Sequence, residues 1–327
     1  MKFLVIGCGS IGKRHISNIE QILPNSTINV YDSQKKILEK ISKKLNVNAV
    51  SEKSIDVEKY DCVFICTPPS SHIQIAKRVA LTGSNIFIEK PISSNSKEIF
   101  QLLSIIKKKN ILAFVGYNFR FHQSIKIIKK IIDSKQLGNP IHFSSYFGSF
   151  LPDWRIDQDY SKNYSARSEL GGGIILDASH ELDYIRYLFG NPKFVLSKYK
   201  NIKFLKTDTD AISDMILEFN RDLFGTIHVD YLRRQYKRTF EVILEYGLIE
   251  WSLIKHEIKI FNGNSRRHKK FKVNNDINHM YIDELKHIIK CIKNKKQSKI
   301  INIDNGIDTF RISKIIKESS GKGRKIK

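Results

Sequence analysis

The stretch FLVIGCGSIG, residues 3–12, joins a four-residue apolar run to three glycines with the spacing GxGxxG. An apolar run followed at once by this spacing is typical of a buried strand that turns into a helix. The first glycine permits a tight turn, the second lets a pyrophosphate approach the backbone, and the third lets the helix pack closely on the strand. The helix N-terminus then faces the phosphates. The residues expected to surround them are Gly7, Gly9, Ser10, Ile11 and Gly12.

The rest of the first third repeats this alternation of apolar runs and amphipathic segments. Further apolar runs lie at 28–31, 62–66, 86–88 and 111–115. Segments with apolar residues at helical spacing separate them, at 11–23, 37–45, 75–81 and 99–106. Continuous apolar strands that alternate with helices predict a parallel sheet covered on both faces.

The second half of the chain has a different period. Residues 211–219, 225–231 and 240–246 alternate apolar and polar side chains, which predicts an open, mostly antiparallel sheet with one buried face. A length of 327 residues, 41% of them hydrophobic, suits two domains. We therefore expect an α/β chain: a doubly wound Rossmann domain at 1–120 and an α+β domain at 121–327, whose C-terminal helix is free to pack back on the first.

Cysteine usage and hydropathy predict a cytoplasmic protein. The four cysteines show no metal-ligand spacing, so we expect no metal and reduced thiols. The N-terminal apolar run is broken by glycines with no cleavage site after it, and no stretch reaches about 18 apolar residues. We expect no membrane partner.

The chain is strongly basic, with 56 Lys and Arg against 33 Asp and Glu, a net charge of +23. A polyanion partner is one interpretation. The lysines are spread along helix faces, however, which favours a solvated basic surface and no nucleic-acid partner. The basic tail at 321–327 is expected to fray.

Asp32 follows the second apolar run, about 20 residues after the glycines. A carboxylate at this point accepts hydrogen bonds from the adenosine ribose and repels the 2′-phosphate of NADP. The alternative is that Asp32 only caps the next helix. We expect NAD as the cofactor and NADP to be disfavoured, although Lys35 and Lys36 lie nearby.

Five motifs then support a family resemblance. They are GCGSIG, TPPSSH at 67–72, EKP at 89–91, GYNFRF at 116–121 and GGGIILDASHELD at 171–183. In this order the chain resembles the Gfo/Idh/MocA oxidoreductases. The resemblance implies an NAD(P)-dependent dehydrogenase acting on a secondary alcohol of a sugar, a cyclitol or a related derivative. It also implies that the sheet of the second domain is an oligomer or substrate surface, and we expect a homo-oligomer, either a dimer or a tetramer.

EKP ends a predicted core strand, where ligands of doubly wound sheets bind. Pro91 restricts its own φ and biases Lys90 toward extended geometry, so the turn directs the lysine side chain. In a family-like site Lys90 stabilises a developing alkoxide, and Glu89 holds the loop or approaches the cofactor. The alternative is a surface ion pair. In TPPSSH, the resemblance places Thr67, Pro68 and His72 beside the nicotinamide, with His72 a structural cap rather than a catalyst.

His180 is the expected proton acceptor, because oxidation of an alcohol needs a base for the hydroxyl proton. A core or helix-capping histidine is the alternative. The usual family pattern has three residues between the preceding Asp and this His, whereas here only Ala178 and Ser179 intervene. Asp177 orients the imidazole or contacts substrate, while Asp183 is a candidate for a structural role.

Substrate contacts are expected from two further places. The loop at 151–173 is rich in aromatic and basic side chains that suit a polar ring with an anionic group. The candidates there are Trp154, Arg155, Tyr164 and Arg167, with Trp154 and Tyr164 equally suited to anchoring the loop. Asn118 and Arg120, at the domain junction, either touch substrate or clamp the domains. The loop at 151–173 resembles the corresponding stretch of family members that belong to surface-polysaccharide sugar pathways.

Two other function classes compete with a dehydrogenase. A non-catalytic dinucleotide-binding sensor or scaffold would keep the glycines but would need neither Lys90 nor His180. A nucleic-acid binder would rest on net charge alone, without zinc spacing or a helix-turn-helix signature.

Overall fold

The computed structural model describes residues 1–220, 222–274 and 276–326. The chain divides into two compact units. Unit 1 comprises Met1–Asn118 and Asn278–Ile307, and unit 2 comprises Phe119–Ile277 and Asp308–Lys327. Residues 278–307, which sequence periodicity left in the second domain, thus belong to the first unit.

Unit 1 is built on a parallel sheet with the order β3-β2-β1-β4-β5-β6. Its described strands are β1 (Lys2–Ile6), β2 (Thr27–Tyr31), β3 (Asn48–Ala49), β4 (Cys62–Ile65), β5 (Ile86–Glu89) and β6 (Ala113–Gly116). The strand order reverses between β1 and β4, and this switch point is where doubly wound sheets bind ligands. The predicted Rossmann domain is confirmed.

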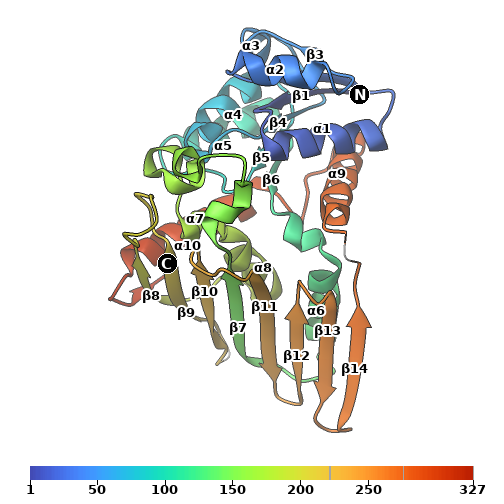
Figure 1. The fold of residues 1–327 in the computed structure, drawn as a ribbon. Helices are drawn as coiled ribbons and strands as arrows, with labels where there is room; N and C mark the ends of the chain where they lie inside the picture. Colours follow the sequence, from blue (N-terminus) through green and yellow to red (C-terminus); the bar gives the residue numbers. More distant parts are fainter. Residues whose placement is uncertain (221, 275, 327) are drawn as a thin grey trace. The chain divides into compact units, whose positions relative to one another are not determined.

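Helices lie on both faces of this sheet (Figure 1). They are α1 (Ser10–Ile22), α2 (Lys35–Ser42), α3 (Ser54–Val57), α4 (His72–Leu81), α5 (Ile99–Lys109) and α9 (Asn278–Lys293). α1 packs on α9, and α4 packs on α5. Because both faces are covered, β1, β4, β5 and β6 are almost completely buried, which explains their unbroken apolar runs.

Unit 2 contains a nine-stranded sheet in the described residues, with the order β14-β13-β12-β11-β7-β10-β9-β8-β15. The strands are β7 (Pro140–Gly148), β8 (Phe194–Lys200), β9 (Ile212–Glu218), β10 (Phe224–Asp230), β11 (Lys237–Leu244), β12 (Gly247–Ser252), β13 (Glu257–Asn262), β14 (Arg267–Lys272) and β15 (Arg324–Lys325). β7 and β10 pair in parallel, and the other pairs are antiparallel. The predicted open, mostly antiparallel sheet is confirmed.

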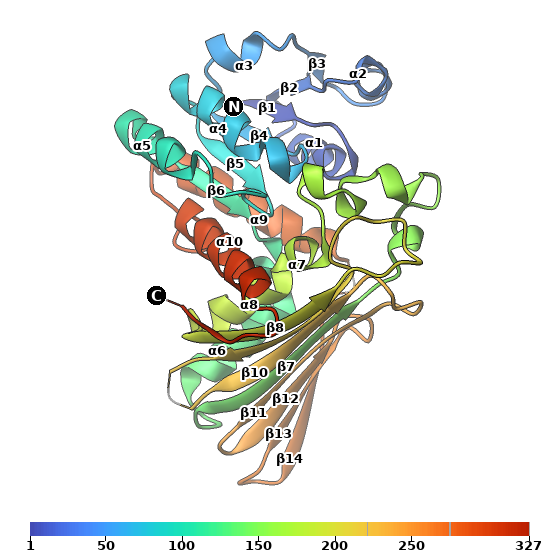
Figure 2. The same ribbon diagram turned by 90° about the vertical axis from the view of Figure 1, so that its left-hand side faces the viewer.

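One face of this sheet forms the core of unit 2. The helices of this part are α6 (Gln123–Ser134), α7 (Ile174–Asp177), α8 (Ser179–Phe189) and α10 (Ile303–Glu318), the last of which begins in unit 1. Figure 2 shows α6 and α8 along a single face of the sheet. Phe143, Phe240 and Trp251 are buried on that inner face. On the opposite, outer face, the drawn ribbon shows no helix among the described residues.

Two features of the chain's ends complete the fold. β15 pairs with β8, so the expectation that the tail frays was wrong for residues 324–325, and Lys327 lies outside the described residues. Among the described helices, none is long and apolar enough to cross a membrane.

Candidate functional site

The glycine loop joins β1 to α1, and two of its glycines are required by close backbone contacts. Gly7 has φ +89°, and a Cβ there would lie 2.7 Å from the carbonyl carbon of Cys66. A Cβ on Gly12 would collide with the backbone oxygen of Gly7. At Gly9, by contrast, a Cβ would meet no atom within 4 Å. The loop therefore packs tightly against the protein at Gly7 and Gly12, and it has open space next to Gly9.

The start of α1 matches the needs of a pyrophosphate. Gly9 is its N-cap, no side chain caps the helix, and both Gly9 and Ser10 are exposed. The first N–H groups of a helix have no partner within it, and they favour an anion. The residues present thus fit the diphosphate of a dinucleotide.

Asp32 lies beside this loop, after the end of β2. One carboxylate oxygen accepts a hydrogen bond from the Cys8 N–H at 2.8 Å, and the other accepts from the Gln34 N–H at 2.9 Å. A carboxylate offers about four lone-pair sites, so two remain for ribose hydroxyls. Asp32 caps the turn before α2 and is only half-buried, which is compatible with both expected roles.

His72 lies inside the turn that follows β4. It is completely buried, with its Nε2 at 2.7 Å from the Thr67 carbonyl oxygen and its Nδ1 at 2.9 Å from the Pro91 carbonyl oxygen. Burial lowers the pKa of His72, and a neutral ring can donate only one hydrogen bond to these two acceptors. His72 therefore supports the turns after β4 and β5 from within. Thr67 and Pro68 keep exposed surface, but the sequence-based cofactor contact of His72 does not fit its burial.

Glu89 and Lys90 lie at the carboxyl end of β5. Glu89 is buried, and one of its oxygens lies 2.7 Å from His15 Nε2. Its other oxygen accepts a hydrogen bond from the Lys90 N–H at 3.1 Å. Lys90 is half-buried, so part of its side chain reaches solvent. These contacts favour the loop-holding role for Glu89.

In unit 2, Asp177 ends α7 inside a cluster of tyrosines. Its Oδ2 accepts a hydrogen bond from the Tyr231 hydroxyl at 2.5 Å. Burial and then the Asp177 charge raise the pKa of both Tyr231 and Tyr164, whose hydroxyl also bonds this carboxylate. Both hydroxyls therefore remain donors, and Asp177 is held as an acceptor.

His180 lies in the first turn of α8, where only Ala178 separates this helix from α7. The residue is 9% exposed, and its ring centroid lies 5.0 Å from that of Phe119. His180 is thus packed against an aromatic ring and retains a small exposed area.

Asp183, one turn further along α8, is a structural acid. Its two oxygens each accept a hydrogen bond from Arg120 at 2.7 Å, and Thr309 donates another at 3.0 Å. These contacts agree with the structural role expected for Asp183. Arg120 is 3% exposed and committed to this pair, which does not fit the expected substrate contact.

Asn118 and the aromatic-basic loop complete the expected set. Asn118 is buried and bonds Tyr281 in unit 1. Trp154 donates a hydrogen bond to Ser149 Oγ at 2.8 Å and packs on Tyr231, so it anchors the loop. Arg155 lies 6.0 Å from the centre of the Tyr164 ring and is partly exposed.

Arg167 is the exposed basic residue of that loop. It forms an ion pair with Glu169 at 3.1 Å on the surface. Such a pair contributes little to stability, so Arg167 remains available to an anionic ligand.

Two residues of these clusters were missed from the sequence. His15 stands on the buried face of α1 with Ile16 and Ile19, and a histidine in an apolar stripe was the signal available. Tyr231 occupies an inward position of the alternating strand at 225–231, where a buried hydroxyl needs a partner.

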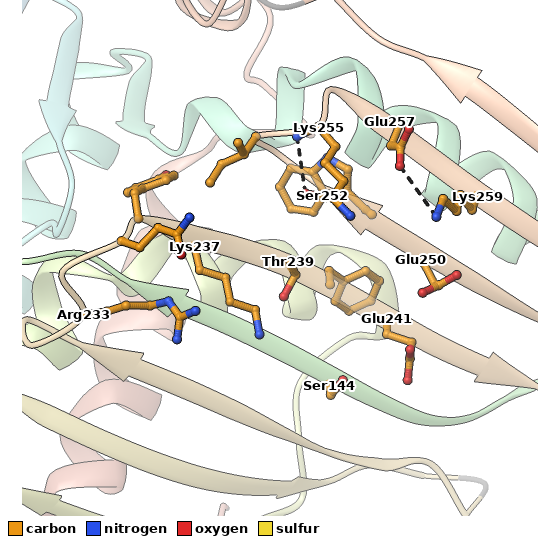
Figure 3. Close-up of a pocket in the computed structure, with 15 residues that line it drawn as sticks. Ser144, Arg233, Lys237, Thr239, Glu241, Glu250, Ser252, Lys255, Glu257 and Lys259 are labelled. Carbon is orange, nitrogen blue, oxygen red and sulfur yellow. Dashed lines mark hydrogen bonds and ion pairs between the residues drawn. The ribbon is translucent and has the colours of Figure 1, made fainter.

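A separate hollow of about 540 Å³ lies on unit 2 along β11 and β12 (Figure 3). Many of the lining side chains are charged, including Arg233, Lys237, Glu241, Glu250 and Lys259. Its described lining includes no residue that the sequence predicted for cofactor or substrate.

Known proteins place this architecture in context. The scyllo-inositol 2-dehydrogenase (NAD(+)) of Bacillus subtilis (strain 168) is 25% identical over 319 residues, which cover 93% of this chain and 90% of that protein. The uncharacterized oxidoreductase YrbE of the same strain is 29% identical over 191 residues. That match covers 57% of this chain and spans about half of YrbE, 53% of its length.

The solved structure of levoglucosan dehydrogenase in complex with NADH and levoglucosan has the same fold. It superposes with a TM-score of 0.88 at 19% identity, covering 100% of this chain and 99% of that one.

Family models cover both units. The oxidoreductase family with an NAD-binding Rossmann fold matches residues 1–117, and the GFO/IDH/MocA C-terminal domain matches residues 125–250. The glycine loop, the switch-point sheet and the second sheet agree with these matches, and the chain belongs to the Gfo/Idh/MocA family of oxidoreductases.

Proposed function

We propose that this protein transfers a hydride between NAD and a secondary alcohol of a sugar, a cyclitol or a sugar derivative. The observation that carries the proposal is the position of Lys90. It follows the carboxyl end of β5, in the same sheet whose switch point carries the open glycine loop. Ligands of doubly wound sheets bind at this edge, so a cation there is suited to a reacting hydroxyl.

The proposed roles divide the proton chemistry between two side chains. Lys90 hydrogen-bonds the hydroxyl and stabilises the developing alkoxide, and His180 accepts the hydroxyl proton. Asp177, held by Tyr164 and Tyr231, accepts a further hydrogen bond from substrate or from the imidazole. NAD, when bound, supplies the hydride acceptor at its nicotinamide ring.

The proposed cofactor is NAD rather than NADP. Gly9 and Ser10 receive the diphosphate, and Asp32 accepts hydrogen bonds from the adenosine ribose. A 2′-phosphate would meet the negative charge of Asp32. The scyllo-inositol 2-dehydrogenase (NAD(+)) of Bacillus subtilis, which aligns with most of this chain, is named for its use of NAD.

A substrate with an anionic group is the proposed class within the sugars. Arg155 and the exposed Arg167 supply positive charge on the loop that also carries Tyr164. Sugars of surface polysaccharides commonly carry carboxylates or phosphates, so we place the reaction in the synthesis of such a sugar, in the cytoplasm.

We also propose that the chain forms a homo-oligomer through the outer face of the sheet in unit 2. Phe224 on β10 and Ile243 on β11 are exposed there, and both pair across His142 of β7 in one row of the sheet. Exposed apolar side chains that share one face of a sheet favour an interface. Light scattering should report a dimer or tetramer, which Phe224→Glu should dissociate and Val57→Glu, on exposed unit 1 surface, should not.

The function is tested by incubating the purified chain with polyols, uronic acids and nucleotide sugars while following reduced nicotinamide by absorbance. Turnover of one of these with NAD is the expected result. NAD binding without turnover of any of them would instead favour a dinucleotide-binding sensor. Binding of RNA that disappears at physiological salt, while NAD binding persists, would exclude a nucleic-acid role.

A further inference from the structure

His15 is a buried histidine on α1, the helix that begins at the glycine loop. The residue is 1% exposed, and aromatic rings surround it. Its ring centroid lies 5.2 Å from that of Phe64, 5.1 Å from that of Phe87 and 6.1 Å from that of Tyr281. An imidazole in such surroundings costs free energy unless its nitrogens find partners.

The partner of His15 is the carboxylate of Glu89, at the far end of β5. His15 Nε2 lies 2.7 Å from Glu89 Oε1, and the two side chains are 1% and 10% exposed. A carboxylate oxygen only accepts, so the imidazole nitrogen donates whenever Glu89 is ionised. Removing the donor would leave a buried carboxylate with one oxygen unpaired, which is strongly unfavourable.

The second carboxylate oxygen of Glu89 is hydrogen-bonded to the backbone of Lys90. Glu89 Oε2 accepts the Lys90 N–H at 3.1 Å. Gly116, on the neighbouring strand β6, leaves room for the Glu89 carboxylate, because a Cβ at this position would lie only 3.2 Å from Glu89 Oε2. A side chain at 116 would therefore press on the carboxylate. The three residues form one continuous chain of hydrogen bonds, from an imidazole to a carboxylate to a peptide N–H.

We propose that His15 is a positioning residue for Lys90 and acts through Glu89. The hydrogen bond to His15 holds the Glu89 carboxylate in one orientation, and the carboxylate in turn holds the backbone from which the Lys90 side chain extends. His15 touches neither substrate nor cofactor in this role. The inference rests on the proposed function of Lys90, but the hydrogen-bond chain is measurable without any substrate.

Two conservative substitutions separate this role from simple packing. His15→Gln places an amide N–H near the position of Nε2, so it can still donate to Glu89. His15→Asn is one methylene shorter and cannot reach. Both are polar and of similar size, so both carry a similar penalty in the aromatic cluster. Asn18→Leu is the matched control, since Asn18 is also buried on α1 but bonds Asn278 of α9 instead.

The substrate-independent measurement is amide hydrogen exchange at Lys90, by NMR with ¹⁵N-lysine labelling and Lys90→Arg to assign the signal. We expect His15→Asn to speed this exchange at least tenfold, and His15→Gln and Asn18→Leu to change it less than threefold. Glu89→Gln, which weakens both hydrogen bonds, should resemble His15→Asn. Equal exchange in His15→Asn and His15→Gln would overturn the proposal, as would acceleration by Asn18→Leu alone.

Turnover with an authentic substrate supplies the second measurement. His15→Asn should lower kcat about tenfold or more and leave the Kd for NAD within twofold, and His15→Gln should recover most of the loss. His15→Asn combined with Glu89→Gln should lose no more than the worse single variant, since the two act in series. If no alcohol is oxidised, the proposed function fails while the exchange result still decides the role of His15. Normal kcat in a folded His15→Asn variant would contradict the proposal.

Discussion

Arg120 and Asp183 form a buried bidentate ion pair inside unit 2, with both guanidinium–carboxylate distances at 2.7 Å. The pair joins the segment after β6 to α8, the helix that carries His180. Because both charged groups are buried away from water, each is stabilised by the other as its counterion, and neither is available to bind a substrate.

The first prediction concerns this pair. Asp183→Asn should lower the free energy of unfolding by about 3–5 kcal/mol, because the buried guanidinium of Arg120 would lose the carboxylate that accepts two of its N–H groups. Asp133→Asn, which removes the exposed pair with Lys129 on α6, should change it by less than about 1 kcal/mol. Urea unfolding of both variants measures the difference. A small effect of Asp183→Asn would show that Arg120 is not held by this carboxylate.

The second prediction concerns cofactor choice. NAD should bind at least several-fold more tightly than NADP, and Asp32→Ala should narrow that ratio by removing the ribose acceptor and the repulsion of a 2′-phosphate. Quenching of protein fluorescence gives both dissociation constants. A wild-type preference for NADP would overturn the assignment of Asp32.

The third prediction uses the contrast between two glycines of the loop. Gly9→Ala adds a methyl group where no protein atom lies within 4 Å, so thermal stability should be retained. NAD affinity should fall about tenfold or more, since the methyl group occupies the approach of the diphosphate. Gly12→Ala should reduce stability itself, because its methyl group meets the backbone of Gly7. Calorimetric unfolding and NAD titration separate the two effects, and unchanged NAD binding in Gly9→Ala would refute the diphosphate position.

The fourth prediction concerns catalysis. Lys90→Ala and His180→Ala should each lower turnover by about a hundredfold or more, with little change in NAD affinity. The double variant should lose less than the product of the two. The turnover of Asp177→Asn measures how much the Asp177 carboxylate, which Tyr164 and Tyr231 hold, contributes to catalysis. Near-normal turnover of His180→Ala across neutral pH would make another group the base.

The fifth prediction concerns His122, the N-cap of α6. Burial, followed by the charge of Arg238, lowers the pKa of His122 to about 4, and its Nδ1 accepts the Ser124 N–H. The unfolded chain binds a proton near pH 6.5 and the folded chain only near pH 4, so stability falls as the pH drops through this window. The loss by pH 4.5 is about 2–3 kcal/mol for this group.

His122→Asn keeps a capping acceptor but does not titrate. Its unfolding free energy should therefore fall less than that of the wild type between pH 7.5 and pH 4.5. Equal losses in the two proteins would show that His122 is protonated in the folded state.

Sequence periodicity predicted β1, β2, β4, β5 and β6 because each is largely buried and reads as an apolar run. The exposed two-residue strand β3 was not predicted. Periodicity could not predict that β7 and β10 pair in parallel, since pairing between distant segments leaves no trace in local alternation. β14 was missed for a different reason. Its sequence RHKKFK is largely exposed and carries no apolar period.

For the candidate site, too, the sequence predicted some features and not others. Motif spacing located the glycine loop, Asp32 and Lys90, because their positions depend on backbone turns whose residue types can be recognised in the sequence. The partners of buried polar groups were not predicted. His72, assigned to the cofactor, is enclosed by two carbonyl oxygens, and His15 was missed because its partner Glu89 is 74 residues away.

The position of β14 at the end of the nine-stranded sheet has a consequence for how copies of the chain can associate. An outermost strand presents unpaired N–H and C=O groups that could template a strand of another molecule. Arg267, Lys269, Lys270 and Lys272 place positive charge along this edge strand, and an approaching copy would bring the same charges. The repulsion opposes ladder extension into fibrils, so this border acts as a gatekeeper against aggregation in a protein rich in β-structure.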